Sequence, residues 1–279
     1  MARIHRVVAM LDAPSLPNCN QSESDYDKLC LDFDGPPEYG YDGKSTWLRG
    51  LNRAKQIVDL IPNIAIDSLV LEIGCGDGMA SVQLAMLGLN TCLTDLRDWR
   101  DPRAAGLPFV AFDLAQPGEL PGEGLQDLIF SYNAFEHFPD PKSVMTRIMA
   151  KVRPGGFLFF EFGPLYSGPW GLHAYRMLSM PFPQFLFRES FWREKIKASG
   201  VQDLGQELAD LQPLNKWTIA QFDNLWISSG CKVIKNLRYG AVDHLDLVLQ
   251  YPNAFQGRGL KLEDLTTQGV MVLLQKPPV

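Results

Sequence analysis

The feature that most constrains this chain is a short apolar run that ends in a glycine-rich turn. Residues 68–74 read SLVLEIG, which is typical of a buried parallel strand, and they run into the turn GCGDG at residues 74–78. Residues 79–87 then have helical spacing, and Gly88 ends the helix. Glycines let such a turn approach a ligand closely, and the helix behind it presents N–H groups and its positive end. The unit predicts an α/β fold with a nucleotide or carboxylate site at the turn.

The alternation of apolar runs and helices continues up to residue 162. Asp140 and Pro141 read as an N-cap and a first helical residue, and the helix behind them ends near Val152. The further predicted strands cover residues 90–96, 108–114, 125–133 and 157–162. Strands that alternate with helices form βαβ units. We therefore predict a parallel sheet with helices on both faces.

Less regular segments flank this core. Residues 1–44 are rich in Pro, Gly, Asp and Asn and predict an irregular N-terminal arm, after which Ser45 reads as the N-cap of a helix over 46–60. Residues 163–214 form an insertion rich in aromatic residues, which reads as a cap with its own small core and also as a wall for a substrate pocket. Behind it we expect a helix, strands over 231–240 and 270–276, and a long connection, 241–268, between them.

Composition excludes several classes of protein. The 26 basic residues are outnumbered by 32 acidic ones, so the net charge of −6 argues against a nucleic-acid partner. No apolar run approaches the ~18 residues of a membrane span, and the short apolar patch near the start does not fit a secretory signal. The five cysteines contain no C-x-x-C spacing, so neither a disulfide framework nor a zinc site is expected. These features favour a cytoplasmic protein.

Three polar residues end the predicted strands at the edge where the glycine turn lies. Asp95 ends the second strand, Asp113 the third and Asn133 the fourth. Ligands of open α/β sheets bind at the carboxyl ends of parallel strands. A carboxylate at position 95 can accept the protons of two ribose hydroxyls. The dinucleotide fingerprint G-x-G-x-x-G does not fit, because Met79 stands where its third glycine would be.

The spacing E-x-G-x-G-x-G resembles that of class I S-adenosylmethionine-dependent methyltransferases. Segments VLEIGCGDG, CLTDL, FVAFDL, LIFSYNAFEHFPDP and VRPGGFLFFEF carry the resemblance over residues 68–162, and residues 218–276 carry it more loosely. The resemblance implies a Rossmann-like seven-stranded sheet in the order 3-2-1-4-5-7-6 with strand seven antiparallel, in a domain over residues 45–279. It also implies S-adenosyl-L-methionine as the cofactor.

The family roles carry over by position. Glu72 and the glycine turn would meet the methionine and ribose parts of the cofactor, Asp95 the ribose, and Asp113 with Leu114 the adenine, while Asn133 and Ala134 would line the sulfonium end. The cofactor-binding residues that we expect are Glu72, Gly74, Cys75, Gly76, Gly78, Asp95, Leu96, Asp113, Leu114, Asn133 and Ala134. Some members bind a divalent metal behind the fourth strand. Asn133 stands where those have an additional acid, so no metal is expected.

Two histidines are candidates for a general base. Transfer of a methyl group to a hydroxyl requires removal of its proton, and an imidazole can take it near neutral pH. His137 directly follows the fourth strand, and His173 lies in the aromatic insertion. Each also has a purely structural interpretation: His137 with Glu136 would order the loop, and the His173 ring would bond to the backbone. The stretch around His173 is also similar to methyltransferases associated with glycan biosynthesis.

The sequence thus predicts an S-adenosylmethionine-dependent methyltransferase. The favoured reaction is O-methylation of a small polar acceptor such as a sugar or glycan intermediate. N- or C-methylation of a metabolite is the alternative within the same class. A cofactor-binding homologue without methyl transfer is the alternative from another class, because the cofactor residues cannot show turnover.

Overall fold

The computed structural model describes residues 2–18, 20–36, 40–203 and 206–278. The chain divides into two compact units. One, here called the sheet unit, comprises Tyr39–Phe162, Gln221–Leu237 and Val270–Val279. The other, the cap unit, comprises Met1–Glu38, Gly163–Ala220 and Arg238–Gly269. The predicted arm, insertion and long connection thus belong to one unit, where the sequence predicted three separate additions to a single domain.

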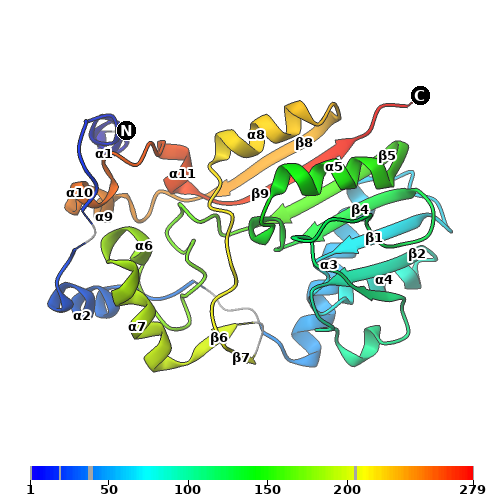
Figure 1. The fold of residues 1–279 in the computed structure, drawn as a ribbon, viewed down its shortest axis with the longest axis horizontal. Helices are drawn as coiled ribbons and strands as arrows, with labels where there is room; N and C mark the ends of the chain where they lie inside the picture. Colours follow the sequence, from blue (N-terminus) through cyan, green and yellow to red (C-terminus); the bar gives the residue numbers. More distant parts are fainter. Residues whose placement is uncertain (1, 19, 37–39, 204–205, 279) are drawn as a thin grey trace. The chain divides into compact units, whose positions relative to one another are not determined.

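The sheet unit is built on seven strands in the order β3-β2-β1-β4-β5-β9-β8 (Figure 1). The strands β3, β2, β1, β4 and β5 are parallel to their neighbours in this order. Strand β9 pairs antiparallel with β5. This confirms the predicted order with an antiparallel strand seven. The strands are β1 Leu69–Ile73, β2 Asn90–Asp95, β3 Phe109–Ala111, β4 Gln126–Tyr132, β5 Val152–Phe162, β8 Lys232–Gly240 and β9 Thr267–Gln275.

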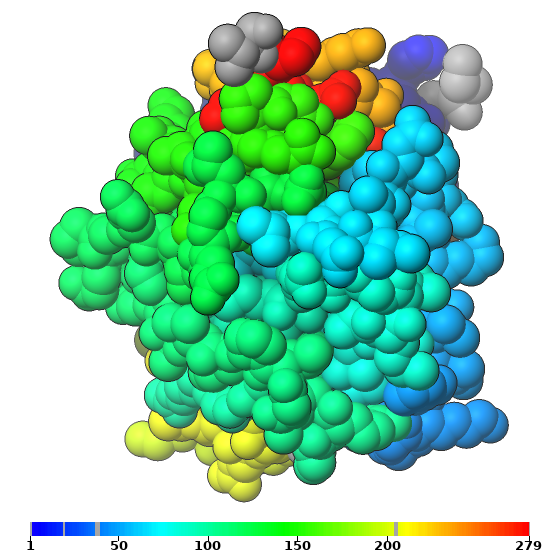
Figure 2. Space-filling view, turned by 90° about the vertical axis from the view of Figure 1, so that its right-hand side faces the viewer, coloured from blue at the N-terminus to red at the C-terminus, as the bar shows by residue number. Residues whose placement is uncertain are grey.

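Helices cover both faces of this sheet, as predicted. On one face lie α3 (Gly43–Leu60) and α4 (Met79–Met86), whose Ile57 and Leu84 share a core with Phe159 of β5. On the other face, α8 (Ile219–Ser228) packs Trp226 against Phe160, the next residue of β5. Successive strand residues point to opposite faces, which explains the division. Helix α5 (Pro141–Lys151) begins behind the Asp140 cap that the sequence predicted. Figure 2 shows a face of this unit made mainly by the segments coloured cyan to green.

Three predicted boundaries need correction. The N-cap of α3 is Asp42 and not Ser45, because the Asp42 carboxylate accepts hydrogen bonds from the backbone N–H groups of residues 44 and 45. Strand β3 ends at Ala111, so Asp113 lies two residues beyond it. Strand β5 begins at Val152 and not at 157. The pairing with β4 shifts its register between Gln126 and Leu128, which accommodates the Pro-Gly-Gly residues that follow position 153 within the strand.

Close packing of α3 on α4 depends on Gly50. A Cβ at this position would lie 2.6 Å from the backbone oxygen of Met79. Only a residue without a side chain permits this approach. The packing brings the N-terminal half of α3 to the start of α4, where the glycine turn lies.

The cap unit contains helices where an irregular arm was expected. Within residues 1–44, α1 spans Ala2–Leu11 and α2 spans Glu23–Asp32, so the interpretation of this arm as irregular is wrong. Ser22 and Asp25 form a capping box that starts α2. The described prolines and glycines of this segment lie outside α1 and α2: Pro14 and Pro17 lie between the two helices, and Gly35, Pro36 and Gly40 follow α2. The remaining elements are α6 Pro183–Leu186, α7 Glu189–Ser199, β6 Val201–Asp203, β7 Gln206–Leu208, α9 Leu245–Gln250, α10 Pro252–Phe255 and α11 Leu262–Thr266.

One apolar core joins the three segments of the cap unit. It includes Val7 and Leu29 from the N-terminal helices, Phe182 from the insertion and Phe255 from α10, all at most 2% exposed. The rings of Phe182 and Phe255 meet edge to face at 5.2 Å. The aromatic residues of the insertion therefore pack against segments that are distant in sequence. No helix in the described part of the chain is both long and apolar enough to cross a bilayer.

Candidate functional site

The glycine turn and the polar strand ends of the sheet unit come together at one edge. Gly74 follows β1, Asp95 ends β2 and Asn133 follows β4, and these three strands are adjacent and parallel. Their carboxyl ends therefore lie at the same edge of the sheet, which is where open α/β sheets bind ligands. The structure brings these three predicted residues together as the sequence required.

The three glycines of the turn all have left-handed backbone conformations, with φ between 52° and 70°. They differ in the space that is available for a side chain. A Cβ at Gly74 would lie 2.5 Å from the Cβ of Ala134, whereas a Cβ at Gly76 would meet nothing within 4 Å. Gly74 thus allows close packing of β1 against the loop behind β4. Gly76 borders open space, as expected where a ligand approaches the backbone.

Asp95 lies against this open glycine. Its Oδ2 accepts a hydrogen bond from the Gly76 N–H at 2.9 Å, and its Oδ1 accepts one from the Leu96 N–H at 2.7 Å. Burial raises the pKa of the carboxyl, while these two bonds oppose the rise. An ionised carboxylate has roughly four lone-pair positions, so acceptor capacity remains on both oxygens. The side chain is thereby oriented and still able to accept hydroxyl protons.

Glu72 lies beneath the turn rather than in it. Its side chain is in β1, only 1% exposed, and its Oε2 accepts a hydrogen bond from the Ser81 hydroxyl at 2.6 Å. Burial raises its pKa to about 8. The observed bond ties β1 to α4, which holds the turn between them in place.

The predicted adenine residues follow β3 in a tight turn. The Asp113 carboxylate accepts a hydrogen bond from the Ala115 N–H at 2.8 Å. Arg147 of α5 donates to the backbone oxygens of Leu114 and Gln116, at 2.5 and 2.9 Å. Asp113 and Leu114 are thus held by the backbone and by α5. They lie two and three residues beyond the end of β3, whereas the sequence placed them in the strand.

Backbone hydrogen bonds order the loop that follows β4 in the sequence. Asn133 has a left-handed backbone conformation (φ 49°), which asparagine tolerates better than most residues, and its N–H donates to the Glu161 backbone oxygen at 2.8 Å. Ala134 accepts a hydrogen bond from the His137 N–H at 2.9 Å, which closes a 3₁₀ turn over Phe135–His137. Asn133, Ala134 and His137 therefore belong to one ordered turn of the sheet unit.

His173 belongs to the cap unit, and its tautomer follows from its contact. Its Nε2 lies 2.7 Å from the backbone oxygen of Pro164. A carbonyl oxygen can only accept, so Nε2 must carry the proton. In the neutral ring Nδ1 then has the lone pair and is the nitrogen that can act as a base. The bond agrees with the structural interpretation of His173.

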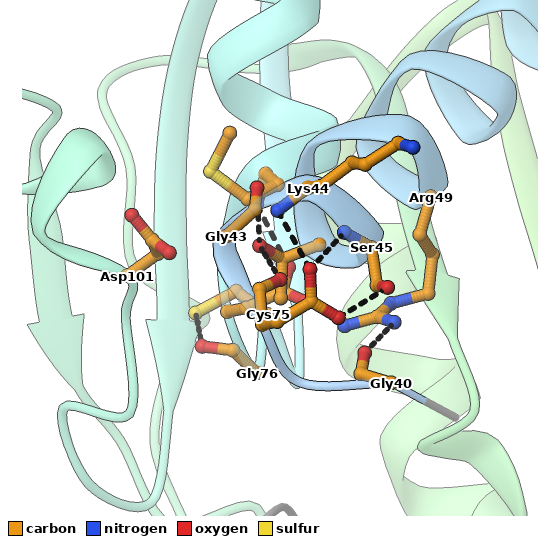
Figure 3. A network of polar contacts seen from close by, with 12 residues as sticks. Gly40, Gly43, Lys44, Ser45, Arg49, Cys75, Gly76 and Asp101 are labelled. Atoms are coloured by element: carbon orange, nitrogen blue, oxygen red, sulfur yellow. Dashed lines mark hydrogen bonds and ion pairs between the residues drawn. The ribbon is translucent and has the colours of Figure 1, made fainter. Parts of the chain in front are cut away.

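Sequence reasoning missed Arg49 of α3. Its guanidinium donates to the Gly40 backbone oxygen at 2.8 Å (Figure 3). It also donates to the Asp77 carboxylate of the glycine turn at 2.7 Å, and its side chain is 13% exposed. Arg103 adds a second connection, because it donates to the Gly43 backbone oxygen at 2.9 Å and the Thr46 hydroxyl at 2.7 Å. The start of α3 is thus fixed against the turn. The sequence feature that could have revealed Arg49 is its helical spacing with Ser45, Asn52 and Gln56 in α3.

A polar hollow of about 540 Å³ opens beside α3. Residues of α3 line one side, and Asn133 and Glu161, from the ends of β4 and β5, line the other. All of its lining residues belong to the sheet unit. It therefore adjoins the loop that the sequence assigns to the reactive end of the cofactor.

The order and directions of the strands are those of the Rossmann-like methyltransferase fold, and the comparisons agree. The family model described as "Methyltransferase domain" matches residues 47–231, so the chain belongs to the methyltransferase-domain family. A crystal structure of an S-adenosylmethionine-dependent methyltransferase from Mesorhizobium loti covers 80% of this chain and 96% of its own, with a TM-score of 0.51 and 17% identity. That likeness supports the fold.

Curated relatives give the family a closer context. The chain is similar to the ubiquinone biosynthesis O-methyltransferase of Bordetella avium, with 30% identity over 161 residues, or 54% of this chain and 65% of the relative. The enzyme of that name from Bordetella pertussis is 34% identical over 99 residues, or 33% of this chain and 41% of the relative. The matches therefore span less than two thirds of these relatives.

Proposed function

We propose that this protein is an S-adenosylmethionine-dependent methyltransferase that methylates a hydroxyl oxygen of a small polar acceptor. One observation carries the proposal: the oriented Asp95 carboxylate lies beside Gly76, whose Cβ position is open. That arrangement suits a ribose, because a carboxylate can accept both vicinal hydroxyl protons while the ring approaches the glycine backbone. The residues present therefore fit the cofactor.

The remaining cofactor roles follow the strand ends. Asp113 and Leu114 would meet the adenine, and Asn133 and Ala134 would line the sulfonium end. Arg49, beside the glycine turn, would attract the carboxylate of the methionine part, since an arginine fork suits a carboxylate. The expected roles of Gly74, Cys75 and Gly78 are to shape the turn, whose backbone N–H groups at 74 and 75 donate to Thr94.

When bound, S-adenosylmethionine supplies a methyl group on a positively charged sulfur. The chain's own task is to align a hydroxyl oxygen with that carbon, exclude water and receive the hydroxyl proton. His137 and His173 are the two candidates for the proton acceptor. The ring of His173 would act through Nδ1, because Nε2 is committed to Pro164.

The names of the curated relatives support oxygen as the atom that is methylated. A sugar-type acceptor remains our preference, because the hollow beside the sulfonium end is lined almost entirely by polar side chains. The most informative test is a methyl-transfer screen over pooled sugars, phenols and amines, read by release of S-adenosylhomocysteine.

Asp95→Ala tests the cofactor assignment. Loss of two charge-assisted hydrogen bonds to the ribose, together worth ~3 kcal/mol, should weaken S-adenosylmethionine binding by about 100-fold in calorimetry on the folded variant. Asp98→Ala is a matched control, because Asp98 is exposed and pairs with Arg100. If Asp95→Ala bound the cofactor as well as the unmodified protein, the ribose assignment would be wrong.

A further inference from the structure

We propose that the hollow beside α3 binds a polyhydroxylated acceptor of the sugar type, and that Gln56 and Glu161 recognise its hydroxyls. This inference rests on the proposed methyl transfer and adds to it the class of acceptor and the residues that select it. It is built from residues of the sheet unit alone.

Helix α3 presents one polar stripe to the hollow. Ser45, Arg49, Asn52 and Gln56 follow one another at spacings of four, three and four residues, so they lie on one face of the helix. A different face of α3, with Gly50 in close contact with Met79, packs on α4. The contact with α4 fixes the rotation of the helix and hence the direction of the polar stripe.

Glu161 and Gln56 both line the hollow, and a hydrogen bond between their side chains orients the Gln56 amide. The Nε2 amide group of Gln56 donates to Oε2 of Glu161. The Tyr132 hydroxyl lies 2.9 Å from Oε1 of Gln56 and 2.9 Å from the Arg53 backbone oxygen. Because the carboxylate can only accept, the amide nitrogen of Gln56 must face Glu161, and Oε1 then faces the Tyr132 hydroxyl.

This pair is suited to a hydroxyl ligand. A hydroxyl group can donate its proton to a carboxylate and accept from an amide N–H at the same time. Glu161 provides acceptor sites beyond the one that Gln56 uses, and Gln56 and Asn52 provide amide hydrogens on the same wall. Two vicinal hydroxyls would therefore find complementary partners here.

The kinds of side chain on the walls favour a hydroxyl ligand over an aromatic or prenylated acceptor. Of the eight lining residues only Leu48 is apolar. Pockets that enclose apolar ligands are lined mainly by hydrophobic and aromatic side chains. The charges are also balanced in number: Arg49 pairs with Asp77, and the two other charged lining residues, Arg53 and Glu161, have opposite signs. Neutral hydroxyls fit this surface better than an isoprenoid chain.

The hollow also adjoins the reactive end of the proposed cofactor. Asn133 lines it, and the N–H of Asn133 donates to the backbone oxygen of Glu161. The next residue, Ala134, lies against Gly74 of the glycine turn. A hydroxyl held by Glu161 is thus next to the loop that would line the sulfonium.

The test uses the full chain and two readouts. With S-adenosylhomocysteine bound, ligand-observed NMR would compare methyl glucosides, methyl rhamnosides and UDP-glucose with catechol and a prenylated catechol. Methyl transfer to the same probes would be followed with S-adenosylmethionine. We expect binding and methylation of sugar probes, and a 10- to 100-fold weaker affinity in Glu161→Gln and Gln56→Leu, with cofactor affinity unchanged.

Asp59→Asn is the matched control, because Asp59 lies on α3 but pairs with Lys55 outside the hollow. It should bind and methylate as the unmodified protein does. Methylation of catechols but not sugars, or unaltered sugar affinity in both Glu161→Gln and Gln56→Leu, would overturn this inference while leaving methyl transfer intact. Binding of the cofactor without binding of any sugar probe would overturn it as well. Failure to bind the cofactor would instead reject the proposed function.

Discussion

Glu72 is a carboxyl group that the fold holds away from water. Because its pKa is raised from 4.5 to about 8, the folded protein keeps a proton that the unfolded chain releases. The contribution of this group to stability is therefore fully present below about pH 4.5 and is lost as pH rises through 8. Glutamine has the same shape and can still accept from Ser81, but it does not titrate.

Glu72→Gln should remove this pH dependence. Between pH 5 and pH 8 the free energy of unfolding of the unmodified protein should fall, relative to that of the variant, by roughly 1.4 kcal/mol per pH unit. Urea unfolding of both proteins across that range measures the difference. Parallel pH profiles would show that Glu72 is ionised in the folded protein at neutral pH.

The two histidines can be separated by kinetics. Replacement of the true base by alanine should lower the turnover number by about 10²–10⁴ and leave cofactor affinity nearly unchanged. The pH–rate profile should also lose its acidic limb. His173 is our preference, through Nδ1. If neither His137→Ala nor His173→Ala slows methyl transfer more than tenfold, alignment alone drives the reaction.

The placement of most residues at the proposed cofactor edge could be predicted, and the reason is local. Gly76 lies in the turn that follows β1 and Asp95 is the last residue of β2, so their place at the sheet edge is set by nearby sequence. Arg49 could not be found in this way. Its partner Asp77 lies 28 residues away, and the pair exists only because α3 packs against α4. The tautomer of His173 likewise depends on a contact with Pro164 that no spacing reveals.

At the scale of elements, Gly50 controls how closely α3 approaches α4. Gly50→Ala should gain about 1 kcal/mol in helix propensity but cost roughly 1–3 kcal/mol in overpacking, and the Met79 backbone that it meets cannot rotate away. We expect a net loss in the free energy of unfolding, measured by urea denaturation. Gly43→Ala is the control, because its Cβ would have no neighbour closer than 3.9 Å. An equally stable Gly50→Ala would mean that the two helices separate without cost.

Periodicity predicted the elements of the sheet better than those of the cap. Strands β1 and β4 contain the apolar runs 69–71 and 128–130, which are visible without knowledge of their partners. The short helices α1 and α2 are stabilised mainly by packing on distant segments, as is usual for helices of ten residues. The prolines and glycines around these helices therefore led to the prediction of an irregular segment, because neither helix is long enough to show a clear period.

At the scale of the whole molecule, the single core of the cap unit predicts a shared response to damage. Phe255 is fully buried against Phe182 and Phe185. Phe255→Ala should cost about 3–5 kcal/mol in the cap unit. Hydrogen exchange should then accelerate together in α1, α7 and α9, which belong to different chain segments. Leu31→Ala, at a residue that is 87% exposed, is the control. Acceleration confined to α10 would show that the three segments do not share one cooperative core.

The shared core also has a consequence during synthesis. Val7 is buried in α1, and Arg3 pairs with Asp246, yet the segment that carries Asp246 is translated more than two hundred residues later. At ~5–20 residues per second this delay is on the order of ten seconds or more. Throughout that interval the apolar side of α1 has no partner from α9, so the earliest helix of the cap unit is among the last to be buried. We therefore expect α1 to stay exposed on the nascent chain long after the strands β1 to β5 are able to pair.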